Sequence, residues 1–304
     1  MWNKLLAFIR LSRLYFLGGG LLLYALGVLI ARYEGYPIDW STYVIGQLYV
    51  TSLQLMTHYL NEYWDIETDR LNKTRTPFSG GSGVGAAGGI SREATFTAAL
   101  VCLAVGTAAA IWLLLEFEVA PSGWAIMALM FLGASFYSSP PLALTGTGYG
   151  ELTASIVVAG LVPALGHVLQ AGRPSVLVLL ATAPLVVLHF AMLISFEFPD
   201  FLSDEAAGKQ TLLVRLGRRL GARVHNAALV LALVLAVAAT FFGLPARVGL
   251  AAVLAAPLIL VQINQIQRMQ RGEPVSFVRL TFLGLIIFAL TAYFAAFSFW
   301  VLGT

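Results

Sequence analysis

NEYWDIETD, residues 61–69, and FEFPDFLSDEAAGKQT, residues 196–211, each join a long apolar run to a cluster of carboxylates. The first cluster contains Asn61, Asp65 and Asp69, and the second contains Asp200 and Asp204. An unpaired charge beside a membrane-spanning segment costs several kcal/mol. The two clusters therefore indicate helix ends at a membrane surface that bind a ligand.

The composition around these clusters is that of an integral membrane protein. Of the 304 residues, 59% are hydrophobic and 11% are charged, and the mean hydropathy is +0.84. Apolar runs recur along the whole chain, and no polar linker divides it, so we expect a single transmembrane domain over residues 1–304. A lone cysteine, Cys102, excludes a disulfide framework or a cysteine metal site.

Apolar windows of about 20 residues predict nine membrane-spanning helices. We therefore expect an all-α, polytopic membrane protein, a bundle around a central cavity that opens on the cytoplasmic side. Before the first span, the N-terminal residues are amphipathic and basic, which favours an interfacial helix over a signal peptide. The predicted spans are residues 14–32, 42–66, 95–115, 121–138, 150–170, 176–199, 222–242, 247–267 and 277–300.

Basic residues orient this bundle. With these spans, 15 of the 18 lysines and arginines fall on one side, and only Arg32, Arg173 and Arg247 fall on the other. Basic loops stay in the cytoplasm. The N-terminus and the loops at 67–94 and 200–221 should therefore be cytoplasmic, with both acidic clusters on that face. This fits a multi-pass protein of a prokaryotic cell membrane, and it explains the pI of about 9.1 without a nucleic-acid partner.

The spacing of the acidic residues predicts a metal site. At 100° per residue, positions four apart drift by only about 40°, so Asn61, Asp65 and Asp69 form one stripe on a helix. Asp200 and Asp204 repeat this pattern, with Glu197 nearby on the same face. Oxygen ligands without histidine or cysteine favour Mg²⁺, with phosphate oxygens completing its shell. We expect all the residues of the two clusters as metal ligands and a diphosphate as the bridging ligand.

Cations interleave with these acids. They are Arg70, Lys73, Arg75, Lys209 and Arg215, and they are expected to bind the diphosphate oxygens. The alternative is that they set the topology or pair with the aspartates. Between them, the glycine-rich stretch at 78–89 lacks the ending of a nucleotide-binding loop, and it is either a mobile flap over the diphosphate or a flexible connector.

Polar side chains also lie further along the two helices. Gln54 and His58 precede Asp65 on nearly the same stripe, and His189 precedes Asp200 by 11 residues. We expect them to line a cavity and to contact a polar substrate. Hydrogen bonds between helices explain them equally well.

With these residues in view, the chain resembles the UbiA superfamily of intramembrane prenyltransferases over its whole length. That family has an NxxxDxxxD motif, matched by residues 61–69, and a DxxxD motif, matched by residues 200–204. The resemblance implies that a prenyl diphosphate ionises to a carbocation, which an aromatic quinone precursor captures. It also implies two Mg²⁺ ions held by the motif residues, with Lys73, Arg75, Lys209 and Arg215 assisting.

Two further stretches look like the 1,4-dihydroxy-2-naphthoate prenyltransferases of menaquinone synthesis, namely FYSSPPLALTGTGYGEL at 136–152 and AGKQTLLVRLG at 207–217. They make dihydroxynaphthoate the expected acceptor. The short spacing from Asp65 to Asp69 is typical of the hydroxybenzoate branch, so 4-hydroxybenzoate is the alternative. Tyr137 either stabilises the carbocation with its ring or anchors the interface.

Two other classes of membrane protein share some of these features. A transporter also carries polar residues in its spans, but its binding residues usually lie at the midplane of broken helices. The CDP-alcohol phosphotransferases use aspartates too, yet no Asp-Gly and Ala-Arg pair precedes either cluster here. A prenyltransferase in the lipid bilayer, with no evident obligate protein partner, remains the expectation, and a transporter remains its alternative.

Overall fold

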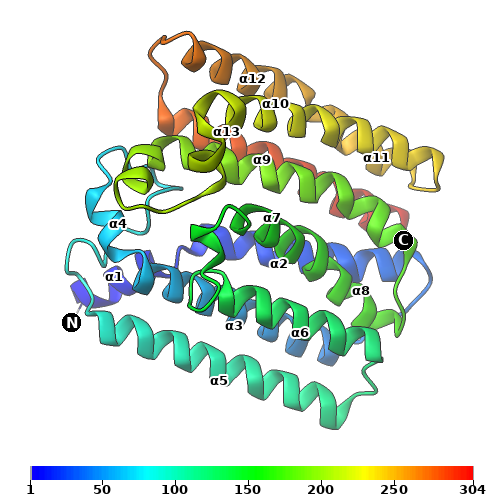
Figure 1. Cartoon of the computed structure of the whole chain (residues 1–304). Coiled ribbons are helices and arrows are strands. Elements are labelled where there is room, and N and C mark those ends of the chain that lie inside the picture. Colours follow the sequence, from blue (N-terminus) through cyan, green and yellow to red (C-terminus); the bar gives the residue numbers. More distant parts are fainter. Residues whose placement is uncertain (1, 304) are drawn as a thin grey trace.

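The protein is a bundle of roughly parallel and antiparallel helices, seen in a computed structural model that describes residues 2–303 (Figure 1). No strand occurs within that range. The helices are α1 (Trp2–Leu11), α2 (Leu14–Tyr33), α3 (Trp40–Trp64), α4 (Ile66–Leu71), α5 (Arg92–Glu116), α6 (Pro121–Phe136), α7 (Gly150–Ser155), α8 (Val162–Ala171), α9 (Val176–Ala206), α10 (Leu212–Phe241), α11 (Ala246–Leu254), α12 (Ala256–Gln270) and α13 (Phe277–Leu302). A short 3-10 turn, η1 (Leu144–Gly146), precedes α7, and a π-helical turn, η2 (Ile156–Leu161), joins α7 to α8.

Seven helical segments of this part of the chain are long and apolar enough to cross a membrane. They are α2, α5, α7 to α8, α9, α10, α11 to α12, and α13. A helix also occupies the predicted spans at 42–66 and 121–138, but α6 has only 16 residues, and α3 carries Gln54, Thr57, His58 and Asn61 on one side. The count of nine spans therefore stays a prediction, while an all-helical, multi-pass membrane protein is what the structure shows.

Several helices begin directly after a residue whose side chain caps the helix N-terminus. The Asp39 carboxylate accepts from the Thr42 amide at 2.7 Å at the start of α3, and Ser91 does the same for the Ala94 amide of α5 at 3.2 Å. Thr211 caps α10 through the Val214 amide. Each side chain satisfies a backbone N–H that the helix leaves without a partner.

The helices pack closely where small residues meet. A Cβ on Gly27 of α2 would lie 1.8 Å from the Pro163 carbonyl oxygen of α8, and one on Gly166 would lie 2.4 Å from the Tyr24 carbonyl oxygen. No side chain fits in either place, so the two backbones can approach each other. Beside this contact, His167 Nε2 bonds Glu34 Oε2 at 2.7 Å, which ties the end of α2 to α8.

Two boundaries differ from the expected ones. The span predicted to end at 199 continues as α9 to Ala206, so Asp200 and Asp204 lie on its last two turns and the connection to α10 shortens to 207–211. α10 starts at Leu212 and kinks at Gly217. The helix carrying the first cluster breaks at Asp65, but the Asp65 amide still donates to the Asn61 carbonyl at 2.9 Å and the Asp69 amide to the Asp65 carbonyl at 2.8 Å. These bonds preserve the predicted stripe.

The arrangement places the sequence-predicted site at one end of the bundle. Helices α1 and α4, the segment between α4 and α5, and the connection from α9 to α10 gather at the left of Figure 1, and the C-terminus lies at the opposite end. Residues far apart in the sequence thus meet at a single end of the molecule.

Candidate active site

A cavity of about 660 Å³ extends into the bundle from this end. Residues of α2, α3, α9 and α13, together with η2, form most of its wall. At its polar end it is lined by Asn61, Asp65, Asp69, Asp200 and Asp204. Its apolar wall includes Leu23, Val157, Met192, Phe196 and Phe288. The volume is in the range of small-molecule sites, and the lining combines a charged end with an apolar chamber.

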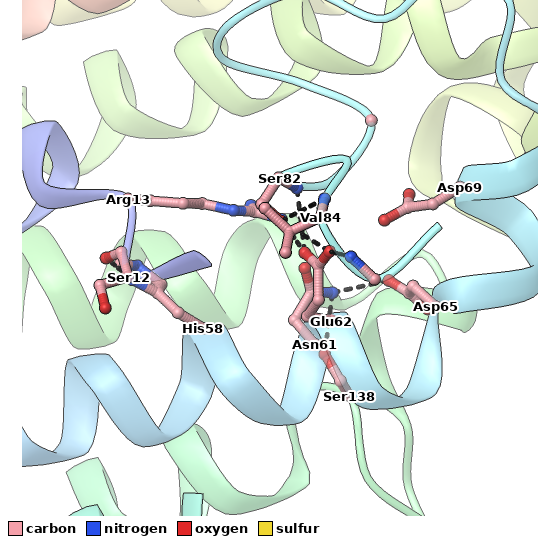
Figure 2. A network of polar contacts seen from close by, with 12 residues as sticks. Ser12, Arg13, His58, Asn61, Glu62, Asp65, Asp69, Ser82, Val84 and Ser138 are labelled. Carbon is pink, nitrogen blue, oxygen red and sulfur yellow. Dashed lines mark hydrogen bonds and ion pairs between the residues drawn. The ribbon is translucent and has the colours of Figure 1, made fainter. Parts of the chain in front are cut away.

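The first cluster is hydrogen-bonded around Asp65. Asn61 Nδ2 donates to Asp65 Oδ2 at 2.6 Å and lies 3.2 Å from Ser138 Oγ, as Figure 2 shows. Lys209 Nζ, from the connection between α9 and α10, donates to the same Asp65 oxygen at 2.7 Å. Lys209 therefore links Asp65 of the first cluster to the connection that follows the second cluster.

Asp200 joins α9 to the segment that follows α4. Its Oδ1 accepts from Asn72 Nδ2 at 2.7 Å, and its Oδ2 accepts from the Gly80 amide at 2.8 Å. The Thr74 hydroxyl donates to the Pro199 carbonyl beside it. Both carboxylate oxygens of Asp200 thus have donors from one loop, which brings the loop against the polar end of the cavity.

Asp69 and Asp204 have free carboxylates. Both are buried, and neither side chain takes part in a hydrogen bond within residues 2–303. Burial, followed by the neighbouring carboxyls of Glu62 and Asp65, raises the pKa of Asp69 to about 7. Burial opposes the charge of Lys209, but the carboxylates of Asp65 and Asp204 outweigh it and raise the pKa of that lysine. The crowded carboxylates at the polar end therefore favour the binding of a further cation.

The donor set fits Mg²⁺. Its oxygens come from carboxylates and one amide, and two of the carboxylates are free to bind a cation. No group of three or more acidic, histidine or cysteine side chains within the described range is already gathered around one point. Mg²⁺ usually binds through one or two carboxylates, with substrate phosphates and water supplying the rest. Asp65 and Asp69 at the junction of α3 and α4 form one pair of carboxylates, and Asp200 and Asp204 of α9 form a second pair.

Glu62 organises the glycine-rich segment next to this site (Figure 2). It is 2% exposed, and its Oε2 pairs with Arg13 Nη2 at 3.2 Å. The same carboxylate accepts from the Ser82 amide at 2.9 Å, the Ser82 hydroxyl at 2.6 Å and the Gly85 amide at 3.1 Å. The segment predicted as either a flap or a connector is therefore anchored to α3, with Ser79, Gly80 and Gly81 lining the cavity.

The polar residues predicted deeper in the chamber all line the cavity. Gln54 Nε2 donates to the Phe16 carbonyl at 2.7 Å, and His58 Nδ1 lies 3.1 Å from the Ser12 carbonyl. His189 Nδ1 lies 3.0 Å from the Ser155 hydroxyl. All three residues therefore line the chamber, and each also joins two parts of the bundle: Gln54 and His189 bridge two helices, and His58 joins α3 to the turn between α1 and α2. Their contact with a substrate stays a prediction.

Among the predicted cations, Lys209 alone lines the cavity. Arg70 is exposed and pairs with Glu67 at 3.0 Å, and the Arg75 Nη2 donates to the Asp69 carbonyl at 3.1 Å. Lys73 is exposed, and the Arg215 guanidinium lies 5.9 Å from the Tyr149 ring. The structure brings none of these four into the lining, so their contact with a diphosphate stays a prediction.

Tyr137 and Glu197 line the cavity, as does Glu151 of the family-like stretch at 136–152. Two further lining residues, Arg13 and Asn72, were not indicated by the sequence. Asn72 follows Asp69 by three residues and lies just past the end of α4, and its closeness to the first cluster in sequence was an available signal. Arg13 carried no such signal, because a basic N-terminus is already explained by topology.

The family of this chain follows from a match between residues 20–286 and the model of the UbiA prenyltransferase family. The chain belongs to the UbiA prenyltransferase family. It is an enzyme of the transferase class, and the family motifs predicted at 61–69 and 200–204 lie together at the polar end of its cavity.

Solved structures of UbiA homologues share the fold of this family member. A homologue from Archaeoglobus fulgidus, bound to GPP and Mg²⁺, is 16% identical with a TM-score of 0.66, covering 96% of this chain and 99% of its own. A digeranylgeranylglyceryl phosphate synthase is also 16% identical, with a TM-score of 0.65 and coverage of 98% and 99%. A homologue from Aeropyrum pernix K1 has a TM-score of 0.62 at 16% identity and covers 88% and 95%.

One curated relative is similar in sequence, the 1,4-dihydroxy-2-naphthoate octaprenyltransferase of Bacillus subtilis (strain 168). It is 23% identical over 170 residues, which is 55% of this chain. The similarity spans about half of that relative's length, 52%.

Proposed function

We propose that this UbiA family member transfers a prenyl group from an allylic prenyl diphosphate to an aromatic quinone precursor and releases diphosphate. The observation that carries this proposal is a charged end, with four aspartates and Lys209, on an otherwise apolar cavity inside a membrane bundle. A charged diphosphate and a lipid tail need these two environments side by side. The A. fulgidus homologue, with structures bound to GPP or DMAPP and Mg²⁺, supports this choice of donor.

Each residue at the polar end has a role in this proposal. Asn61, Asp65, Asp69, Asp200 and Asp204 would hold two Mg²⁺ ions, whose charge, when bound, stabilises the leaving diphosphate. Lys209 would exchange Asp65 for a diphosphate oxygen, since its ammonium already reaches the centre of the site. Arg70, Lys73, Arg75 and Arg215 would add positive charge at the rim.

The apolar chamber protects the carbocation that forms. Its aliphatic and aromatic wall excludes water, which would otherwise capture the cation. The Tyr137 ring would stabilise the positive charge through its face. Gln54, His58 and His189 add polar contacts for the acceptor, while Glu197 lies nearer the aspartates.

For the acceptor we propose 1,4-dihydroxy-2-naphthoate, which places the reaction in menaquinone synthesis. The B. subtilis relative supports this choice. The alternative is 4-hydroxybenzoate, which the spacing of the first motif favours.

We further propose that residues 1–304 form one prenyltransferase domain in a prokaryotic cell membrane. The active-site segments 67–94 and 200–221 and the N-terminus would face the cytoplasm. The grouping of 15 of the 18 basic residues on one side of the predicted spans supports this orientation.

The test of the proposed function is a pair of substitutions, Asp65→Asn and Asp200→Asn. Each should lower prenyl transfer at least about 100-fold, because a metal ligand is lost while the shape of the side chain is kept. Asp39→Asn is the matched control, since Asn caps a helix as well as Asp does and Asp39 lies at the other end of α3. Near-normal transfer in either site variant, with the protein folded in detergent, would contradict the two-metal proposal.

A further inference from the structure

Asn72 joins the loop after α4 to a metal-ligand candidate on another helix. It follows α4 directly, and its Nδ2 donates to Asp200 Oδ1 of α9 at 2.7 Å. Its Oδ1 accepts from the Thr74 amide at 2.9 Å. Because a backbone N–H can only donate, the bond to Thr74 fixes which end of the Asn72 amide faces Asp200. The side chain therefore presents a donor to the carboxylate.

The same two bonds make Asn72 unsuited to bind a metal itself. A cation binds an amide through its oxygen, and the Asn72 oxygen is directed at the Thr74 amide. The Asp200 carboxylate keeps room for a cation, because a carboxylate has about four acceptor positions and the bonds from Asn72 and Gly80 fill only two of them. Asn72 thus holds a metal-ligand candidate without competing for the metal.

Gly80 brings a second donor to the same carboxylate and packs against Asn72. Its amide donates to Asp200 Oδ2 at 2.8 Å. A Cβ on Gly80 would lie 2.4 Å from Asn72 Nδ2, and the φ of Gly80 is +73°, so glycine lets the loop close tightly here. Two donors on different oxygens fix the rotation of the Asp200 carboxylate.

The next residue of this loop reaches the other acidic cluster. A Cβ on Gly81 would lie 1.7 Å from Asp69 Oδ2. Consecutive residues of one loop therefore contact Asp200 of α9 and Asp69 of α4. Two carboxylates from different helices can share metal ions only if their separation is held, because metal ligands must stand within about 0.5 Å of the productive geometry. The loop supplies that separation.

We propose that Asn72 is a positioning residue of the metal site, which orients Asp200 for Mg²⁺ and fixes its place relative to the first cluster. The inference rests on the proposed function and adds to its metal site a residue outside both motifs. Asn72 acts through Asp200. Hydrogen-bond partners of metal ligands set the orientation of those ligands, and their loss weakens metal binding.

The first test measures the Mg²⁺ requirement of Asn72→Ser. Serine keeps a side-chain oxygen for the Thr74 amide but is too short to reach Asp200. The Mg²⁺ concentration for half-maximal diphosphate release should rise about 10- to 100-fold, the usual cost of losing such a partner. The rate at saturating Mg²⁺ should stay within about threefold, because the metal ligands themselves remain. An unchanged Mg²⁺ requirement would overturn the inference.

Thr74→Val is the matched control. The Thr74 hydroxyl donates to the Pro199 carbonyl, so it joins the same loop to the same end of α9 without contacting a carboxylate. Valine keeps the amide that Asn72 accepts from. This variant should retain the Mg²⁺ requirement of the unaltered protein. An equal rise in Thr74→Val and Asn72→Ser would overturn the inference, because attachment of the loop alone would then account for both.

The second test measures metal binding without turnover. Mn²⁺ takes the same oxygen ligands as Mg²⁺, and its free form is counted by electron paramagnetic resonance, here with inorganic diphosphate present. The unaltered protein and Thr74→Val should bind Mn²⁺ alike, and Asn72→Ser about 10- to 100-fold more weakly. Equal affinity in Asn72→Ser would contradict the positioning role. If Asn72→Ser does not fold, Asn72→Asp serves, since it keeps the acceptor for Thr74 and repels Asp200, and weaker Mn²⁺ binding is again expected.

The outcomes also separate this inference from the proposed function. An unaltered protein that binds no Mn²⁺ with diphosphate and releases no diphosphate from any prenyl donor fails the proposed function, and the inference with it. An unaltered protein that does both, together with an Asn72→Ser variant of equal Mg²⁺ requirement and equal Mn²⁺ affinity, fails the inference alone.

Discussion

Gly81 shows how closely the loop after α4 approaches the metal-ligand candidates. A Cβ there would lie 1.7 Å from Asp69 Oδ2, and its φ is +71°. Gly81→Ala should therefore displace the Asp69 carboxylate and lower transfer at least about tenfold. Gly88→Ala is the matched control, because Gly88 has the same φ of +71° and nothing within 4 Å of its Cβ. Steady-state transfer rates of the two variants give the comparison, and equal rates would mean that strain alone matters.

Lys209 is the cation that the structure places inside the site. Lys209→Ala should raise the KM for the prenyl diphosphate by about tenfold or more, since a charge-assisted hydrogen bond is lost. Lys4→Ala, an exposed lysine on α1, should leave the KM unchanged. Initial rates against donor concentration measure both. An unaltered KM in Lys209→Ala would mean that this lysine serves only topology.

At the scale of elements, Glu62 couples α3 to the glycine-rich segment. Glu62→Gln breaks a buried ion pair with Arg13 and weakens two amide contacts, which should cost about 3–5 kcal/mol locally. Amide hydrogen exchange in residues 80–90 should rise as the segment detaches from α3. Glu67→Gln removes the exposed pair with Arg70 and should change little. Unchanged exchange in Glu62→Gln would show that the segment is held by other contacts.

The sequence predicted that the first acidic cluster shares one helix face, for a geometric reason. A spacing of four residues fixes one face of a helix, so Asn61, Asp65 and Asp69 could be placed together from their spacing alone. The helix break at Asp65 leaves that face intact, because the backbone bonds from Asn61 to Asp69 persist. Lys209 was also indicated, by its position just after the second cluster.

The parts that depend on loop paths could not be predicted. Nothing in the local sequence says that Glu62 binds Ser82 and Gly85, that Asn72 reaches Asp200, or that Arg13 approaches from the turn between α1 and α2. These contacts join residues 20 to 128 positions apart. The end of α9 was also placed too early, at 199, whereas this helix continues through Pro199 to Ala206.

At the scale of the whole molecule, apolar composition dictates a membrane bundle, and the basic residues predict its orientation. Single cysteines introduced by Ala87→Cys and Ala207→Cys, with Cys102→Ala, should react with an impermeant reagent from the same membrane side. Arg173→Cys should react from the opposite side. Labelling in sealed vesicles of known orientation tests this. Labelling of Ala87→Cys and Arg173→Cys from one side would contradict the predicted topology.

Mass spectrometry of the products tests the proposed reaction most directly. The purified protein would be incubated with Mg²⁺, a mixture of prenyl diphosphates, and an acceptor panel that includes 1,4-dihydroxy-2-naphthoate and 4-hydroxybenzoate. We predict one prenylated aromatic product, abolished by EDTA and restored by excess Mg²⁺, and its mass identifies both substrates. The absence of any prenylated product, with no diphosphate released from any donor, would contradict the proposed function and favour transport instead.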